Sequence, residues 1–117
     1  MKALNKVLTK FLRGGEGMEK ILIIYEEHNA THTDAYTSFS FDPKPLSEPK
    51  RIGGGTHKRY MTIVQKNTIA KIVRRSNRGN LRVMKIKIDT PVYIDFLGNC
   101  FALEEEDYEL ARTLNLI

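Results

Sequence analysis

The sequence is poor in cysteine and in long apolar runs, and its residues 49–88 include no acidic residue. A single cysteine, Cys100, excludes an internal disulfide and any cysteine-rich zinc site, which fits a reducing compartment. No apolar run approaches the roughly 18 residues that a membrane span requires, and the first residues lack the uninterrupted apolar segment of a secretory signal. We therefore expect a cytoplasmic protein without a transmembrane segment, with Cys100 as a small buried side chain.

The acid-free segment is also the most basic part of the chain. Residues 49–88 hold twelve of the nineteen lysines and arginines and no aspartate or glutamate. Closely spaced cations repel one another and gain most when phosphates replace their counterions. With a net charge of +5 and a pI near 9.4, the whole chain favours a polyanionic partner. Charge alone fits nucleic acid, anionic lipid or an acidic protein.

Familiar nucleic-acid-binding patterns are absent. The sequence has no RNP, KH, zinc-finger or helix-turn-helix pattern, so we expect contacts mostly to the phosphate backbone rather than readout of bases. A solvated basic face that protects a sheet edge is the structural alternative. The candidate phosphate contacts are the cations of the basic segment and one aromatic residue among them: Lys50, Arg51, Lys58, Arg59, Tyr60, Arg74, Arg75, Arg78, Arg82, Lys85 and Lys87.

The first seventeen residues are expected to stand apart from the rest. Residues 2–13 have apolar side chains at helical spacing and lysines on another face, which predicts a short amphipathic helix. Gly14 to Gly17 then form a linker. A Gly-Gly-Glu codon run can contain a bacterial ribosome-binding sequence, and Met18 follows it closely. We hypothesise that Met18 is a second start, which makes residues 1–17 an extension and residues 18–117 a single α+β domain.

The hydrophobic pattern of residues 18–117 predicts an antiparallel sheet of about five strands, with a helix at residues 104–114 packed across one face. The continuous apolar run at residues 21–25 indicates a central strand that is covered on both faces. Asp42 to His57 are expected to form an irregular loop, because prolines and glycines interrupt them. The predicted strands are residues 20–26, 35–42, 60–65, 68–75, 81–88 and 92–96. The predicted core residues are Ile21, Ile23, Phe39, Ile63, Ile72, Ile86, Ile94, Phe96, Tyr108 and Leu114.

Two of these strands are expected to form a hairpin with a basic outer face. Residues 76–80 have the composition of a turn and separate the strands at 68–75 and 81–88. In the second strand Lys85 and Lys87 alternate with apolar residues. Cations therefore gather on the solvent side and at the tip around Arg78.

Enzymatic chemistry is the less favoured interpretation. His28, His32 and His57 lie on predicted loops, and a metal-independent ribonuclease or phosphoesterase would use two of them, with His32 and His57 as the candidates, as general acid and base. The His28-His32 spacing suits a metal only on a helix, which the intervening residues disfavour, so we expect no metal site and no cofactor. Cys100 has no neighbouring activator and is not expected to be a nucleophile.

Three functions remain. The first is a small basic protein that binds RNA or DNA, of a kind common in phages and mobile elements. The second is a binder or hydrolase of a nucleotide or another small phosphorylated ligand, held under the Gly53–Gly55 loop. That loop lacks the Gly-Lys-Ser/Thr ending of a P-loop. The third is an interaction module that docks on an acidic protein, for example as an inhibitor.

Overall fold

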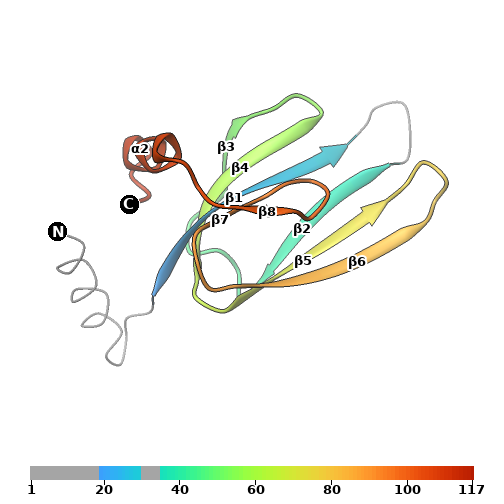
Figure 1. Ribbon diagram of the computed structural model, residues 1–117, viewed down its shortest axis with the longest axis horizontal. Helices are drawn as coiled ribbons and strands as arrows, with labels where there is room; N and C mark the ends of the chain where they lie inside the picture. The colour runs from blue at the N-terminus through green and yellow to red at the C-terminus, as the bar shows by residue number, and fades with distance from the viewer. Residues whose placement is uncertain (1–18, 30–34) are drawn as a thin grey trace.

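The computed structural model of the chain describes residues 19–29 and 35–117. Eight strands in these ranges form one sheet, and a single helix follows them (Figure 1). The predicted N-terminal helix, its linker and His32 lie outside the described residues. The elements are β1 (Lys20–Asn29), β2 (Tyr36–Asp42), β3 (Lys50–Gly53), β4 (His57–Gln65), β5 (Thr68–Arg75), β6 (Leu81–Ile88), β7 (Val92–Ile94), β8 (Cys100–Phe101) and α2 (Glu105–Thr113).

Strand β1 organises the sheet, because three strands share its two edges. Along one edge it pairs with β4 over nearly its whole length. Along the other, residues 23–25 pair in parallel with β7, and only the last two residues pair with β2. The main strand order is β3-β4-β1-β2-β5-β6, and all neighbouring pairs except β1 with β7 are antiparallel. Since β2 leaves β1 after this short contact, β2, β5 and β6 can pack under the rest of β1.

The two faces of β1 belong to two apolar clusters. Because successive side chains of a strand point to opposite faces, Ile23 and Ile24 enter different clusters. One cluster lies between β1, β4 and β7 and the inner face of β2, β5 and β6. Its buried members are Ile21, Ile23, Tyr25, Val64, Ala70, Ile72, Ile88 and Ile94. The prediction of a central strand covered on both faces is confirmed.

The second cluster is covered by α2. Figure 1 shows this helix near β3 and β4. Ala111 of the helix is buried together with Leu22, Ile24, Met61 and Ile63. The helix starts after Glu104, whose backbone N–H donates to an oxygen of Asp107 at 2.7 Å. Acidic residues fill the first turn, where they complement the helix dipole. The helix at the C-terminal end is therefore confirmed within one residue of its predicted ends.

Several details of the predicted fold are wrong. The sheet has eight strands rather than about five, and β3 lies inside the segment that was predicted as irregular loop. An exposed edge strand of four residues lacks the apolar alternation by which strands are recognised, and Pro49 and the glycines mask it further. Cys100 is an exposed residue, where a buried one was expected. Partial desolvation of its thiol, together with the carboxylate of Asp95, raises the pKa of Cys100.

Most of the predicted core is found inside. Ile21, Ile23, Ile63, Ile72 and Ile94 are buried. Phe39, Ile86, Tyr108 and Leu114 are partly buried and pack against the two clusters. Phe96 is half-buried and lies apart from both clusters, against two histidines.

Candidate functional site

The hairpin of β5 and β6 separates the cations of the basic segment onto two faces. Residues that lie directly opposite in the ladder share a face, and alternate residues of a strand share a face. The outer face, away from the core, carries Lys71, Arg75, Lys85 and Lys87. The inner face carries Arg74 and Arg82 at the end of the hairpin. The hairpin with its basic outer face is present, but the predicted phosphate contacts do not form one surface.

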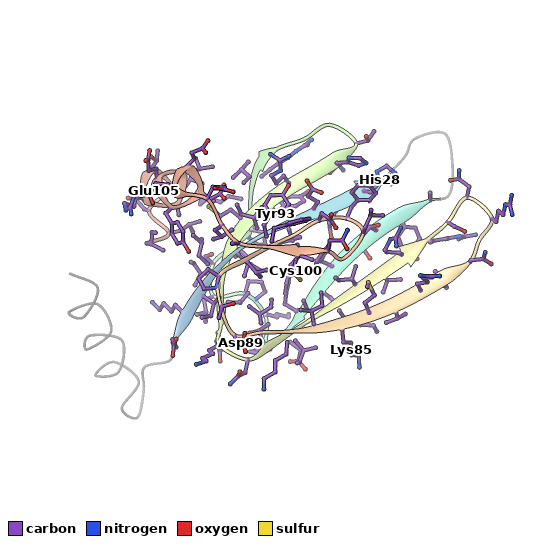
Figure 2. All side chains as sticks on the ribbon, in the orientation of Figure 1. His28, Lys85, Asp89, Tyr93, Cys100 and Glu105 are labelled. Carbon is purple, nitrogen blue, oxygen red and sulfur yellow. The ribbon has the colours of Figure 1, made fainter. Side chains whose placement is uncertain are left out.

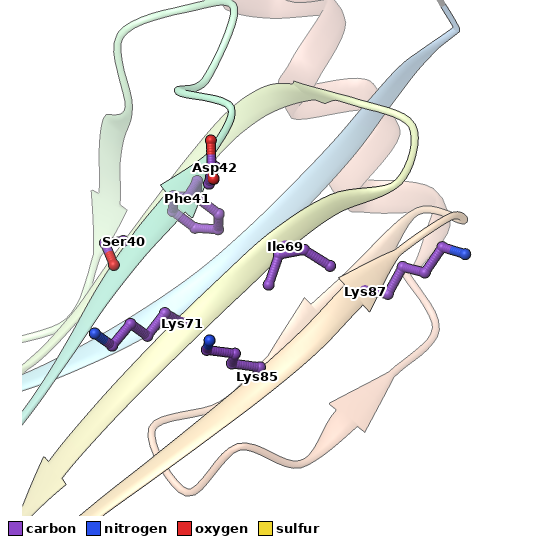
Figure 3. Close-up of a pocket in the computed structure, with 7 residues that line it drawn as sticks. All are labelled: Ser40, Phe41, Asp42, Ile69, Lys71, Lys85 and Lys87. Carbon is purple, nitrogen blue, oxygen red and sulfur yellow. The ribbon is translucent and has the colours of Figure 1, made fainter.

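A hollow of about 460 Å³ lies on the outer face of β2, β5 and β6 (Figure 3). Three lysines line it, together with the hydroxyl-bearing Ser40 and the carboxylate of Asp42. We call this hollow the lysine groove, and its lysines are Lys71, Lys85 and Lys87. Lys71 was missed at the sequence level, because it stands alone among apolar residues of β5. Only the ladder brings it opposite Lys85.

The charge of the lysine groove is largely uncompensated. Lys71 and Lys85 are a directly opposed pair of like charges, an arrangement that destabilises a sheet. The ion pairs of the described residues are Glu26 with Arg59 and Glu19 with Lys66, and neither involves the groove. Asp42 is the one acidic residue of its lining. The groove is therefore a site where an anion would relieve repulsion.

A second hollow of about 490 Å³ lies at the ends of β1, β2 and β4, and its lining takes in residues of both faces, including His28, Thr37 and the acidic Glu27. Tyr36 and Lys58 line it. Tyr36 lies opposite Arg75, which in turn lies opposite Leu81. Leu81 is 61% exposed and Val83 is 57% exposed. The outer face thus combines cations, one half-buried aromatic ring and exposed apolar side chains.

The predicted aromatic contact, Tyr60, faces the core instead. Tyr60 lies opposite Tyr25 in the ladder of β1 and β4, and the two rings stack with centroids 5.3 Å apart. Tyr36 is the aromatic residue that the outer face offers. The sequence places Tyr36, Ser38 and Ser40 on one face of β2. It does not reveal that β5, whose cations make this face basic, pairs with β2.

The glycine loop is a tight connection between β3 and β4. The guanidinium of Arg51 donates to the carbonyls of Gly54 and Gly55 at 2.9 Å and 3.3 Å. Gly54 has a φ of +87°, and a Cβ there would meet the carbonyl oxygen of His57 at 1.6 Å. The loop therefore needs glycine at this position, and it turns carbonyl oxygens toward Arg51. Lys50, at the start of β3, is exposed.

Arg59, another predicted phosphate contact, is held by a buried carboxylate. Glu26 is only 9% exposed, lies opposite Arg59, and forms an ion pair with it at 3.5 Å. Glu26 also accepts hydrogen bonds from the hydroxyl of Tyr93 and, at 3.3 Å, from the backbone N–H of Phe96. Burial and this carboxylate raise the pKa of Tyr93 to about 12. Figure 2 shows Tyr93 on the helix side of His28.

His28 and His57 meet at the end of β1 and β4. They are directly opposed in the ladder, with ring centroids 4.6 Å apart. Phe96 stacks on His57 at 4.2 Å with an angle of 22° between the rings. Burial, together with the neighbouring His57, lowers the pKa of His28. The structure thus pairs two of the three histidines that were considered for catalysis, while His32 lies outside the described residues.

Arg78 stands in the exposed turn at the tip of the hairpin. The hydroxyl of Ser76 accepts from the backbone N–H groups of Arg78 and Asn80 at 3.3 Å and 3.2 Å. Gly79 completes the turn with a φ of +84°. This hydrogen bonding orders the backbone and leaves the Arg78 side chain exposed.

Neither a metal centre nor a membrane helix is found in the described part of the chain. Residues 19–29 and 35–117 contain no group of three or more histidine, cysteine or acidic side chains placed to hold a metal ion. In the same ranges no helix has the length and apolar character needed to cross a membrane. No protein-family model, curated protein or solved structure matches the chain.

Proposed function

We propose that the outer face of β2, β5 and β6 binds nucleic acid by contacting the phosphate backbone of the nucleic acid. One observation carries the proposal: Lys71, Lys85 and Lys87 surround a hollow and have no ion-pair partner among the described residues. If the lysines served only to protect the edge of the sheet against aggregation, they would be needed on the edge strand β6 alone. Lys71 lies on β5, an interior strand.

The spacing of the lysines suits a chain of phosphates. Residues two apart on a strand are separated by about 6.8 Å, and neighbouring strands by about 4.8 Å. Lys85 and Lys87 are two apart on β6, and Lys71 is opposite Lys85. A row of phosphates along the hairpin would replace counterions between these ammonium groups and remove their mutual repulsion.

Single-stranded nucleic acid fits this face better than a duplex does. Proteins that bind single strands combine a basic groove with aromatic side chains on which bases stack. Tyr36 lies opposite Arg75 at the far end of the same face. The proposed path therefore runs from the lysine groove, across the exposed Val83 and Leu81, to Tyr36.

The test compares two triple variants with the same change in charge. Lys71→Gln/Lys85→Gln/Lys87→Gln alters the groove, and Lys20→Gln/Lys44→Gln/Lys66→Gln alters exposed lysines elsewhere. Binding to labelled single-stranded RNA, single-stranded DNA and duplex DNA is measured by fluorescence anisotropy at several salt concentrations. On a single strand, each phosphate contact contributes about 0.7 to the slope of log affinity against log salt concentration. The groove variant loses three lysines, so the magnitude of this slope should fall by about 2.

Two outcomes would contradict the proposal. Absence of binding to all three nucleic acids at low salt would remove it, and the basic face would then be assigned to an acidic protein. Equal weakening in both triple variants would show that net charge, rather than the lysine groove, attracts the polyanion.

A further inference from the structure

A row of five residues crosses five neighbouring strands at one end of the sheet. His57 of β4 lies opposite His28 of β1, and His28 lies opposite Thr37 of β2. Thr37 lies opposite Arg74 of β5, which lies opposite Arg82 of β6. Because directly opposed residues share a face, all five stand on the same side of the sheet. We call them the tip row, and this side is opposite to the lysine groove.

Two nitrogen atoms of the tip row are buried without a hydrogen-bond partner. They are Nδ1 of His28 and Nε of Arg74, which flank Thr37 on its two sides. The hydroxyl of Thr37 donates to the carbonyl oxygen of Phe96 at 3.1 Å and accepts from neither nitrogen. A buried donor without an acceptor costs free energy, so such groups in folded proteins point to a missing partner.

No carboxylate supplies that partner. The ion pairs of the described residues do not include Arg74, although Arg74 is half-buried. The nearest acid on the same face of β1 is Glu26, and Arg59 and Tyr93 already occupy it. A half-buried guanidinium without a carboxylate is ready for an external anion, because its fork of donors matches planar and tetrahedral oxyanions.

At the histidine end of the tip row, the rings of His28, His57 and Phe96 pack on one another. Phe96 stacks on His57 at 4.2 Å and lies 5.5 Å from His28, so the three rings hold one another in place. Ring packing of this kind fixes imidazole donors before a ligand arrives, which lowers the entropy cost of binding.

We propose that the tip row is a phosphate-binding site in which Arg74 and His28 donate to the oxygens of one phosphate group, with Arg82 beside them at the open end. The site lies on the other face from the lysine groove and does not depend on the proposed function. The phosphate belongs either to a free mononucleotide or to the end of a nucleic-acid strand, since both present the same oxyanion.

The test compares two arginine variants with the same change in charge. Arg74→Gln removes a member of the tip row, while Arg112→Gln makes the same charge change at an exposed residue of α2. Inorganic phosphate, adenosine monophosphate, and a dinucleotide with and without a 5′-phosphate are titrated while the unfolding temperature is followed. Phosphate should raise this temperature in the natural chain and in Arg112→Gln. Its apparent Kd should weaken roughly tenfold in Arg74→Gln, as expected for loss of a charge-assisted hydrogen bond.

A second measurement keeps the proposal testable if Arg74→Gln folds poorly. In the natural chain, phosphate should shift the NMR signals of the His28 ring and of the Thr37 and Arg74 amides. A stronger response to adenosine monophosphate assigns the site to a mononucleotide, and a stronger response to the 5′-phosphorylated dinucleotide assigns it to a strand end. Equal responses in the two arginine variants, or NMR shifts confined to the lysine groove, would overturn the proposal. In the groove triple variant, phosphate should still shift the signals of the His28 ring and of the Thr37 and Arg74 amides, which separates this result from the nucleic-acid test.

Discussion

Arg74 and Arg75 are neighbours in β5 but stand on opposite faces of the sheet. Arg74 lies between Thr37 and Arg82 in the tip row, whereas Arg75 lies between Tyr36 and Leu81 on the outer face. A segment that is uniformly basic in sequence therefore becomes two cationic surfaces in space. The two surfaces can be tested separately.

Tyr36 should contribute to the binding of single strands. Tyr36→Ala removes the ring beside Arg75, and stacking of one base on an aromatic ring is worth about 1–3 kcal/mol. Affinity for single-stranded RNA should fall by roughly tenfold or more, measured by fluorescence anisotropy, while duplex binding changes little. Tyr36→Phe is the matched control and should retain the affinity. An equal loss in both variants would contradict stacking and assign the effect to the hydroxyl.

The free protein should be more stable without one of the opposed lysines. Lys71→Thr removes the like-charge contact with Lys85 and places a β-branched residue in a strand. We expect an increase of about 0.5 kcal/mol in the free energy of unfolding at low salt, shrinking as salt is added. Urea unfolding at two salt concentrations measures it. The same variant should bind nucleic acid more weakly, so stability and binding change in opposite directions. Lower stability at low salt would show that Lys71 and Lys85 do not repel each other.

The sequence reveals elements whose signal is local. The apolar run at residues 21–25, the turn at residues 76–80 and the acidic start of α2 each identify their element, because periodicity, turn chemistry and the helix dipole act over a few residues. The residues around the candidate sites depend on pairing between distant strands. Lys71 meets Lys85, and His28 meets Thr37, only through the ladders. No pattern within one strand contains that information.

The same limit explains the misplaced site residues. Tyr60 follows two cations in the sequence, which predicts an exposed ring that contacts nucleic acid. In the ladder, however, its partner is the buried Tyr25. Arg59 looks free in the sequence, and its carboxylate partner Glu26 is distant in the chain. Both assignments need the register of β1 against β4, which the hydrophobic pattern does not fix.

The hydroxyl of Tyr93 should stabilise the fold through the buried Glu26. Tyr93→Phe leaves the carboxylate with one fewer donor, and loss of a hydrogen bond to a buried charge costs about 1.5–3 kcal/mol. Urea unfolding should show this decrease. Tyr108→Phe is the control, since Tyr108 packs against the helix-side cluster and is not among the donors to Glu26. A change of a few tenths of a kcal/mol in Tyr93→Phe would mean that water replaces the hydroxyl.

The glycine loop offers a test with an adjacent control. Gly54→Ala places a Cβ 1.6 Å from the carbonyl oxygen of His57, at a residue with φ of +87°. Gly55→Ala meets no atom within 4 Å. We expect the first change to destabilise the protein by about 2 kcal/mol or more and the second to be nearly neutral, measured by thermal unfolding. Similar unfolding temperatures for the two variants would show that the turn between β3 and β4 rearranges freely.

His28 should make the stability of the protein depend on pH. Its pKa is lowered in the folded chain by burial and by His57, so the unfolded chain binds the proton more tightly. Stability is therefore full above the ordinary histidine pKa near 6.5 and is lost as the pH falls through that value toward the lower folded pKa. The charged groups that line a hollow with His28 are Glu27 and Lys58, and the titratable ring against it is His57. On its own face of β1, Glu26 is already paired with Arg59.

The measurement is the unfolding temperature of the natural chain and of His28→Asn between pH 7.5 and pH 5. The natural chain should lose stability on acidification, and the variant should lose less. Sulfate, which keeps its charge over this range, should restore part of the loss in the natural chain, because an oxyanion in the tip row would favour protonated His28. If acidification lowers the unfolding temperature of both proteins equally, groups other than His28 cause the pH dependence of stability.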